Sequence, residues 1–232
     1  MGIEKDFEAI KSIANKITVE DINNYIKTVV TDNNRVVLIE AIEKEGVTYP
    51  TEKEILTILE DVNNSDIEPY KDEMGDKELI SKEIIPGKVV KESVDKKLGT
   101  KTWTLSNGAK IVLKNTDYKK DQIMINGVSK GGAYLYDNNE ADVYNTLVFD
   151  EVIGLSKLGG FTNNEIKKLL AGKRANASVS LGNKSEAVRG VSSVKDIETF
   201  LQLIYLHFTD ISKDNEAFSV WQDALKEALK NI

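Results

Sequence analysis

An Asn-Gly dipeptide between two apolar runs constrains the fold of this chain more than any other feature. Asn107 and Gly108 separate the runs 103–105 and 109–113. A type I′ turn needs positive φ at both central residues, and Asn-Gly adopts that conformation more readily than most pairs. The sequence therefore predicts an antiparallel β-hairpin over 103–113.

The elements expected after this hairpin come as strands and blocks of helices. The apolar run 122–128 predicts a third strand, and the mostly apolar stretch 140–153 predicts a helix. Hairpins imply antiparallel pairs, and helices in blocks cover a sheet from one side. We predict an α+β fold with an antiparallel sheet of about five strands and helices on one face. The other expected elements are a helix capped by Thr162 and Glu165, a hairpin of 176–181 and 187–192 around Gly182-Asn183, and amphipathic helices over 193–208 and 214–232.

The N-terminal segment predicts two helices and one strand. Apolar residues follow a helical period over 5–15 and again after Thr18, which is the expected N-cap of the second helix. Residues 35–42 are a short β-branched run. Such a segment is too small to complete a sheet core. We expect residues 1–42 to be the tail of a preceding domain, with a small independent subdomain as the alternative. In the first case the unpaired edge of 35–42 is expected to dock on the main domain, to self-associate or to be poorly ordered.

Residues 43–97 differ in composition and predict a linker between domains. Thr51 and Glu54 form a capping box for one helix there. The stretch 66–100 is charged, weakly periodic and too long for an ordinary loop, so we expect it to follow a domain surface. Its contacts would be Ile67, Leu79, Ile80, Ile84, Ile85, Val89 and Val90. The main domain is expected over 98–232.

Composition excludes several classes of function. The net charge is −7 and basic residues are interspersed with acidic ones, which argues against a nucleic-acid partner. The absence of cysteine excludes disulfides, thiolate metal sites and cysteine nucleophiles. No apolar run approaches the ~20 residues of a transmembrane helix, and no signal-peptide pattern is visible.

His207 is the single histidine, so it limits any catalytic or metal site. Its place near the end of a predicted helix favours a partly buried histidine or a partner of the helix dipole. As a metal ligand it needs two carboxylates, and none is marked near it. No Gly-x-Ser-x-Gly elbow accompanies it.

Three other features each have one structural and one functional interpretation. The glycines of 127–132 lack Walker spacing and favour a strand end and turn over a phosphate cradle. Tyr134 and Tyr136 either stack on a ligand or flank a sheet edge. An acidic cluster favours a solvated helix face over weak cation binding, and it consists of Asp137, Glu140, Asp142, Asp150 and Glu151.

A family resemblance is carried by the main-domain stretches 103–114, Gly131-Gly132, 158–161, 169–173 and 196–203. The sequences and the order of these stretches resemble the pitrilysin/insulinase-type (M16) zinc peptidases, especially the large bacterial ones built as tandem halves. Residues 17–42 resemble the segment that closes one half. The resemblance implies a LuxS/mitochondrial-processing-peptidase-like metallohydrolase fold. It also implies that the chain is an internal piece of a longer peptidase, containing the first domain of the non-catalytic C-terminal half.

The chain departs from the family at the metal motif. Active M16 domains carry His-x-x-Glu-His on the helix after the third strand. The resemblance places Asp142, Asn145 and Thr146 at those positions, so we predict no catalytic residue, no metal ligand and no bound cofactor in this chain. Zinc would belong to the catalytic half of the same polypeptide, and this part would help to enclose a peptide substrate. Substrate-binding residues are not identified, and the family suggests a bacterial periplasm or cell envelope as the compartment.

Two alternatives remain open. One is a stand-alone scaffold of the same superfamily that pairs with a separate catalytic subunit. The other is an unrelated α+β enzyme that uses a carboxylate pair near Asp142 and Glu151.

Overall fold

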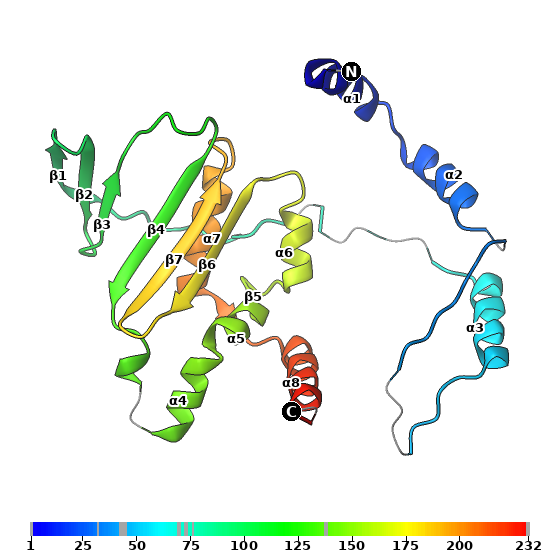
Figure 1. The fold of residues 1–232 in the computed structure, drawn as a ribbon. Coiled ribbons are helices and arrows are strands. Elements are labelled where there is room, and N and C mark those ends of the chain that lie inside the picture. The colour runs from blue at the N-terminus through cyan, green and yellow to red at the C-terminus, as the bar shows by residue number, and fades with distance from the viewer. Residues whose placement is uncertain are drawn as a thin grey trace. The chain divides into compact units, whose positions relative to one another are not determined.

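The computed structural model describes residues 2–31, 33–41, 46–68, 71, 74–75, 77–136 and 139–230 (Figure 1). The chain divides by packing into two compact units, Met1–Glu68 and Pro69–Ile232. The predicted division at 42 and 97 is not tested by this packing and stays a prediction.

The first unit contains three short amphipathic helices. They are α1 (Ile3–Ala14), α2 (Val19–Val29) and α3 (Glu52–Asn64). The predicted caps are confirmed, because Thr18 accepts a hydrogen bond from the Asp21 amide and Thr51 accepts one from the Glu54 amide. The Asp21 carboxylate accepts the Thr18 amide and hydroxyl in return, which holds its pKa below the usual range.

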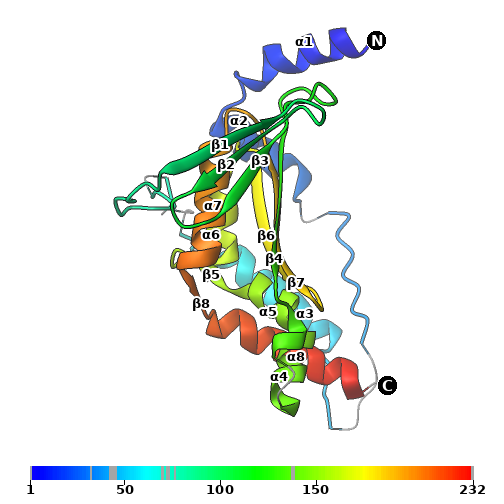
Figure 2. The same ribbon diagram turned by 90° about the vertical axis from the view of Figure 1, so that its left-hand side faces the viewer.

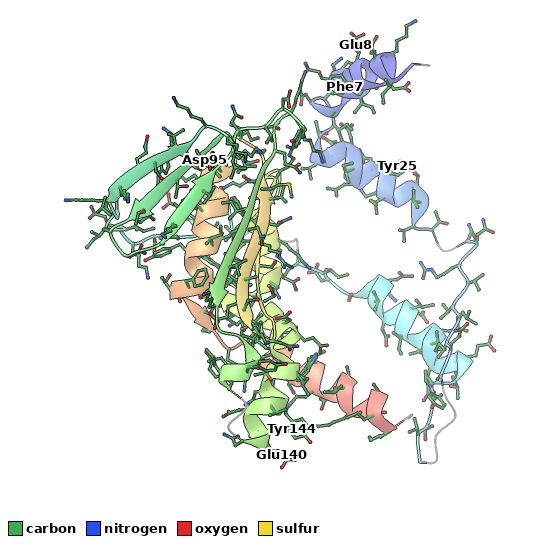
Figure 3. The ribbon with its side chains drawn as sticks, turned by 60° about the vertical axis from the view of Figure 1, so that its left-hand side comes forward. Phe7, Glu8, Tyr25, Asp95, Glu140 and Tyr144 are labelled. Atoms are coloured by element: carbon green, nitrogen blue, oxygen red, sulfur yellow. The ribbon has the colours of Figure 1, made fainter. Side chains whose placement is uncertain are left out.

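The prediction of a strand at 35–42 is wrong for the residues of this range that the structure describes. Residues 35–41 form no regular secondary structure, and residue 42 lies outside the described residues. A β-branched run becomes a strand only where another strand accepts its hydrogen bonds, and Val36 and Leu38 are instead 89% and 78% exposed. The helices of this unit also leave apolar side chains in solvent, as Phe7 and Tyr25 show in Figure 3.

The second unit confirms the α+β class but divides its strands differently. We expected one sheet of about five strands; the structure has two three-stranded antiparallel sheets and one two-stranded ladder. Sheet A is ordered β1 (Val89–Asp95), β2 (Thr100–Leu105) and β3 (Lys110–Leu113). Sheet B is ordered β4 (Ile123–Lys130), β7 (Ser185–Ser192) and β6 (Ala175–Leu181), and the ladder pairs β5 (Lys157–Leu158) with β8 (Ile211–Ser212).

Strand β1 lies inside the stretch that we expected to be a linker. It pairs with β2 over most of its length, and all seven of its residues are exposed. Because neither face of β1 is buried, its sequence shows no alternation of apolar and polar residues. The tight β1–β2 turn is held by the Asp95 carboxylate, which accepts the amides of Lys97 and Leu98 at 2.8 and 3.0 Å.

The helices of the second unit agree with the expected order. The predicted helix over 140–153 is broken at Val148, whose φ of −104° and ψ of 5° are not helical. The helical elements are η1 (Ala133–Leu135), α4 (Glu140–Leu147), α5 (Phe149–Leu155), α6 (Asn163–Leu169), α7 (Ile197–Thr209) and α8 (Asn215–Lys230). The capping box of Thr162 and Glu165 on α6 is confirmed.

Both predicted hairpins form, but neither has the predicted turn. At β2–β3 only Gly108 has positive φ, at 85°, and its amide donates to the Leu105 carbonyl at 2.9 Å. This is the three-residue loop in which a glycine follows a type I turn, so the type I′ assignment is wrong. At β6–β7 the Gly182 amide donates to the Ser185 carbonyl, so the two loop residues are Asn183 and Lys184.

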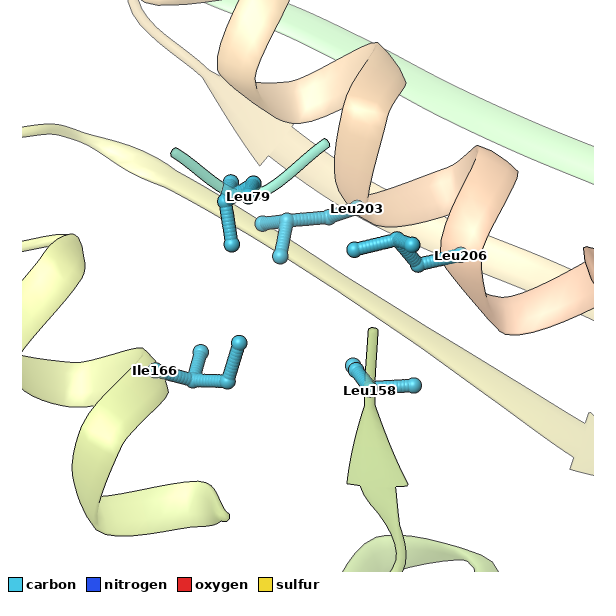
Figure 4. Packing of buried hydrophobic residues seen from close by; sticks show 5 residues of the cluster. All are labelled: Leu79, Leu158, Ile166, Leu203 and Leu206. Carbon is cyan, nitrogen blue, oxygen red and sulfur yellow. The ribbon is translucent and has the colours of Figure 1, made fainter. Parts of the chain in front are cut away.

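The buried hydrophobic residues of the second unit include Met74 and Leu79 of the expected linker. Leu79 is 8% exposed and packs with Leu158 and Ile166, and the same cluster contains Leu203 and Leu206 of α7 (Figure 4). Ile80 packs against this cluster, whereas Ile67 and Ile85 are 71% and 92% exposed. Only part of the expected linker therefore lies on the domain surface.

Sheet B is covered by helices on one face. Figures 1 and 2 show α6 and α7 on the same side of this sheet. Phe200 of α7 is completely buried, and a Cβ built on Gly190 of β7 would overlap the Phe200 ring and the Asn176 carbonyl oxygen. Residues alternate between faces along a strand, so Glu186 and Val188 share the helix face with Gly190. Met124 and Val128 of β4 lie on the other face and are 73% and 68% exposed.

This contact predicts the effect of a single methyl group. We expect Gly190→Ala to lower the free energy of unfolding by roughly 1–3 kcal/mol, because the added Cβ has no room between α7 and β6. Gly154→Ala is the matched control, since a Cβ at that helical position meets nothing within 4 Å and gains about 0.5–1 kcal/mol from helix propensity. Urea unfolding measures both values. Equal effects of the two substitutions would contradict the close approach at Gly190.

The start of α7 is anchored by the carboxylate of Asp196, which is 6% exposed. Its Oδ2 accepts the Ser193 hydroxyl at 2.6 Å and the Arg174 amide at 2.9 Å. These hydrogen bonds, with smaller contributions from Lys195 and Lys173, hold the pKa of Asp196 below its ordinary value of 3.8. The contact ties the β7–α7 connection to the residue before β6.

A lowered pKa gives this anchor a defined pH dependence. The ionised form is favoured in the folded state, so its stabilisation is fully present above the ordinary value of 3.8 and is lost as the pH falls through the folded pKa. We expect the difference in unfolding free energy between wild type and Asp196→Asn to be constant near neutral pH and to shrink below that value. Asp223→Asn, on the exposed face of α8, is the control. Urea midpoints that show no pH-dependent difference for Asp196→Asn would contradict the anchor.

Candidate functional site

Helix α4 presents on one face the three residues that we expected at the positions of the metal motif. Asp142, Asn145 and Thr146 are spaced i, i+3 and i+4, so they lie together on a helix. The helix starts at Asn139, whose Oδ1 accepts the Asp142 amide at 3.0 Å and whose Nδ2 donates to Asp142 Oδ2 at 2.6 Å. Tyr144 lies on another part of the helix and donates to Glu140 (Figure 3).

These three residues line a cavity of about 710 Å³, which we call the α4 cavity. Its other walls come from the end of β4, the end of β6, the start of β7, helix α5 and the end of α7. Most of the lining side chains are apolar. Besides the α4 residues, the lining consists of Gly127, Val128, Ser129, Tyr136, Phe149, Ile153, Val179, Ser180, Leu181, Glu186, Ala187, Val188, His207, Phe208 and Ile211.

The α4 cavity brings together polar groups that are far apart in the sequence. Asp142, Glu186 and His207 come from α4, β7 and α7. Sequence patterns did not single out Glu186 or Phe208. One signal in the sequence could have identified Glu186. Side chains alternate between the two faces along β7, and this alternation places Glu186 on the same helix-covered face as Gly190.

His207 is half-buried near the end of α7, as its sequence position predicted. Its Nδ1 lies 2.8 Å from the Leu203 carbonyl oxygen. A carbonyl only accepts, so Nδ1 is the donor in this contact. The imidazole is thus oriented by its own helix.

The glycines of 127–132 form a strand end and turn, as predicted. The Gly131 amide donates to the Lys184 carbonyl at 3.3 Å, and the Gly132 amide approaches Glu186 Oε1 at 3.5 Å. A Cβ at Gly132 would overlap the backbone of the β6–β7 turn, and φ there is 92°. These amides point into the protein and do not form a phosphate cradle.

The acidic cluster is dispersed by the fold. Asp137 lies outside the described residues. Asp150 accepts the Leu181 amide at 2.9 Å, and Glu151 accepts the Trp221 indole N–H at 3.0 Å. Asp142 lines the α4 cavity and Glu151 does not, so the structure does not bring this carboxylate pair to one site. Of the two tyrosines, Tyr136 lines the cavity, while the Tyr134 ring lies 5.7 Å from the ammonium of Lys184.

Comparisons with known proteins relate the chain to zinc peptidases. It is 23% identical to the zinc protease PQQL-like of Arabidopsis thaliana, over 99% of this chain and 21% of that protein. The chain thus spans about a fifth of the length of this curated relative. No family model matches.

One solved structure supports the fold, and a second is reported beside it. The periplasmic protease PqqL from Escherichia coli matches 78% of this chain and 20% of its own chain, with a TM-score of 0.59 and 17% identity. The ferredoxin protease FusC, in complex with Arabidopsis ferredoxin, matches 72% of this chain and 18% of its own, with a TM-score of 0.49 and 15% identity. The resemblance to the M16 family is confirmed.

The M16 motif positions do not fit a zinc ion. Zinc in proteins takes imidazole, thiolate or carboxylate ligands, and the three positions supply one carboxylate, one amide and one hydroxyl. Across the described part of the chain, no three His, Cys, Asp or Glu side chains are grouped so as to hold a metal. Sharing the walls of one cavity therefore does not make Asp142, Glu186 and His207 an M16-type zinc site.

Among the described residues, no helix combines the length and the apolar character that crossing a bilayer requires.

Proposed function

We propose that this chain is a non-catalytic portion of a zinc-dependent M16-type peptidase and forms part of the wall that encloses a peptide. The chain has a peptidase-family scaffold, which supports the general assignment. The finer assignment is supported by the α4 face, where Asp142, Asn145 and Thr146 lie together and line the α4 cavity. At the expected motif positions these residues would stand in place of both imidazoles and the general base. The zinc ion and the cleavage step would belong to another part of the whole protein.

Sheet B offers a surface for peptide contacts. Its order leaves one edge of β4 and one edge of β6 without a partner strand among the described residues. An edge strand presents unpaired N–H and C=O groups, to which an extended peptide can add by main-chain hydrogen bonds. The open face beside the β4 edge carries Met124 and Val128, both largely exposed, so apolar side chains of a bound peptide would have contacts there.

The α4 cavity, at one end of the sheet, would contribute selectivity. It is mostly apolar, contains Asp142 and Glu186, and has no lysine or arginine among its described lining residues. Opposite charges attract more strongly beside apolar walls than in open water. A peptide side chain that is long and basic therefore suits this cavity.

The assignment predicts peptide binding without cleavage. We expect the purified chain with added Zn²⁺ to bind unstructured peptides but to leave internally quenched peptides intact, because no general base lies beside a metal. Asp142→Ala should leave the peptides equally intact, and Asp223→Ala is the matched control. Fluorescence dequenching and mass spectrometry measure cleavage. Cleavage by the chain alone that Asp142→Ala abolishes and Asp223→Ala preserves would contradict the proposal and favour a carboxylate enzyme.

A further inference from the structure

A second cavity lies at the other end of sheet B. The strand register sets Ile123 of β4 and Ala175 of β6 beside Ser192 of β7 at this end, and Ser129 and Leu181 beside Glu186 at the α4 end. This second cavity has a volume of about 410 Å³, and we call it the basic cavity. It is lined by Lys119, Lys120, Asp121, Gln122, Lys173, Arg174, Ala175, Asn176, Val191 and Ser192.

The charge of the basic cavity opposes that of the whole chain. Four of its lining side chains are cationic and one is anionic, whereas the chain has a net charge of −7. Like charges repel, so a group of lysines and arginine around one hollow costs stability unless an anion reduces the repulsion. The composition of this cavity therefore indicates an anionic ligand.

The one carboxylate in the lining is already used by the protein. Asp121 accepts the Arg174 guanidinium through Oδ2 at 2.9 Å and through its own carbonyl oxygen at 2.6 Å. Asp121 Oδ1 accepts the Val194 amide at 3.0 Å. These contacts fix the loop before β4 against the loops before β6 and α7, so they form a braced frame around the cavity.

The lysines around this frame are not neutralised equally. Lys173 donates to the Thr199 hydroxyl at 3.2 Å and lies near enough to Asp196 to lower the pKa of that carboxyl. Lys119 and Lys120 are exposed, and neither forms a hydrogen bond or ion pair with any residue that the structure describes. Two ammonium groups at the mouth of the cavity are therefore available to a ligand.

We propose that the basic cavity binds carboxylates of an acidic peptide segment. This inference rests on the proposed function, because the cavity opens where β4 begins, with Gln122 in its lining. A peptide added to the free edge of β4 advances about 3.3 Å per residue, so its end beyond Ile123 runs toward residues 119–122, which lead into β4. Acidic side chains at that end meet the two free ammonium groups.

The test uses the full 232-residue chain and matched peptides. The probes are eight-residue peptides of β-branched residues, acetylated and amidated to remove terminal charges. They carry Glu-Glu or Gln-Gln at one end and an uncharged fluorophore at the other, and both end placements are made. Fluorescence anisotropy measures affinity at ionic strengths of about 0.01 and 0.15 M, where screening differs strongly. Inorganic pyrophosphate is the third probe.

We expect the better-placed Glu-Glu peptide to bind about tenfold more tightly than its Gln-Gln counterpart at low salt. Lys119→Gln with Lys120→Gln should abolish this preference, because it removes the two free charges without disturbing a contact. Lys96→Gln with Lys97→Gln, in the exposed β1–β2 turn, is the matched control and should keep the preference. Circular dichroism checks that both double variants fold.

The other outcomes separate the two proposals. Gln-Gln binding with no Glu preference overturns the basic-cavity assignment and leaves the peptide-binding surface standing. A lysine-dependent Glu-Glu signal with no Gln-Gln binding supports the anion site but contradicts peptide addition to the sheet edge. Pyrophosphate binding that needs Lys119 and Lys120, without any Glu preference, overturns the peptide carboxylate as ligand. Loss of the preference in both double variants shows a general charge effect and also overturns the assignment.

Discussion

The packing of Phe200 against Gly190 determines how the rest of the second unit is arranged. The ring is completely buried, and it fits only because β7 has no side chain at that point. Helix α7 is thereby seated on sheet B, with its start anchored by Asp196 and its end placed beside the strand ends. The last turn of α7 then contributes His207 and Phe208 to the α4 cavity. A residue with a Cβ at position 190 would move the helix and with it one wall of that cavity.

The two ends of sheet B differ in chemistry, and the difference follows from which loops meet there. At one end α4 and the start of β7 bring Asp142 and Glu186 to a mostly apolar hollow. At the other end the loops before β4 and β6 bring lysines and an arginine together, with Asp121 serving as an internal brace. Between them, the uncovered face exposes Met124 and Val128. We propose that this surface, with opposite charge preferences at its two ends, helps to enclose and align a peptide.

Features that depend on neighbouring residues were predicted well from the sequence, and features that depend on distant partners were not. The helix caps at Thr18, Thr51 and Thr162 were predictable because each is decided by residues within one helical turn. The hairpin at Asn107-Gly108 was predictable, but its turn type was not, because loop length also depends on the register of β2 and β3. Residues 35–41 have the composition of a strand and lack a neighbour to pair with, whereas β1 has a partner and lacks the apolar pattern. The α4 cavity and the basic cavity join residues up to 84 and 73 positions apart, measured from Gly127 to Ile211 and from Lys119 to Ser192, and only the folded register shows them.

The zinc content of the purified chain tests the central claim most directly. Elemental analysis after dialysis against trace zinc should give well below one zinc ion per chain, because the α4 positions offer one carboxylate and no imidazole. Asp142→Ala and His207→Ala variants measured beside it should give the same low value. One tightly held equivalent of zinc in the wild type, lost in either variant, would show a metal site in the α4 cavity. That result would contradict the assignment of this chain as a non-catalytic part of an M16-type peptidase.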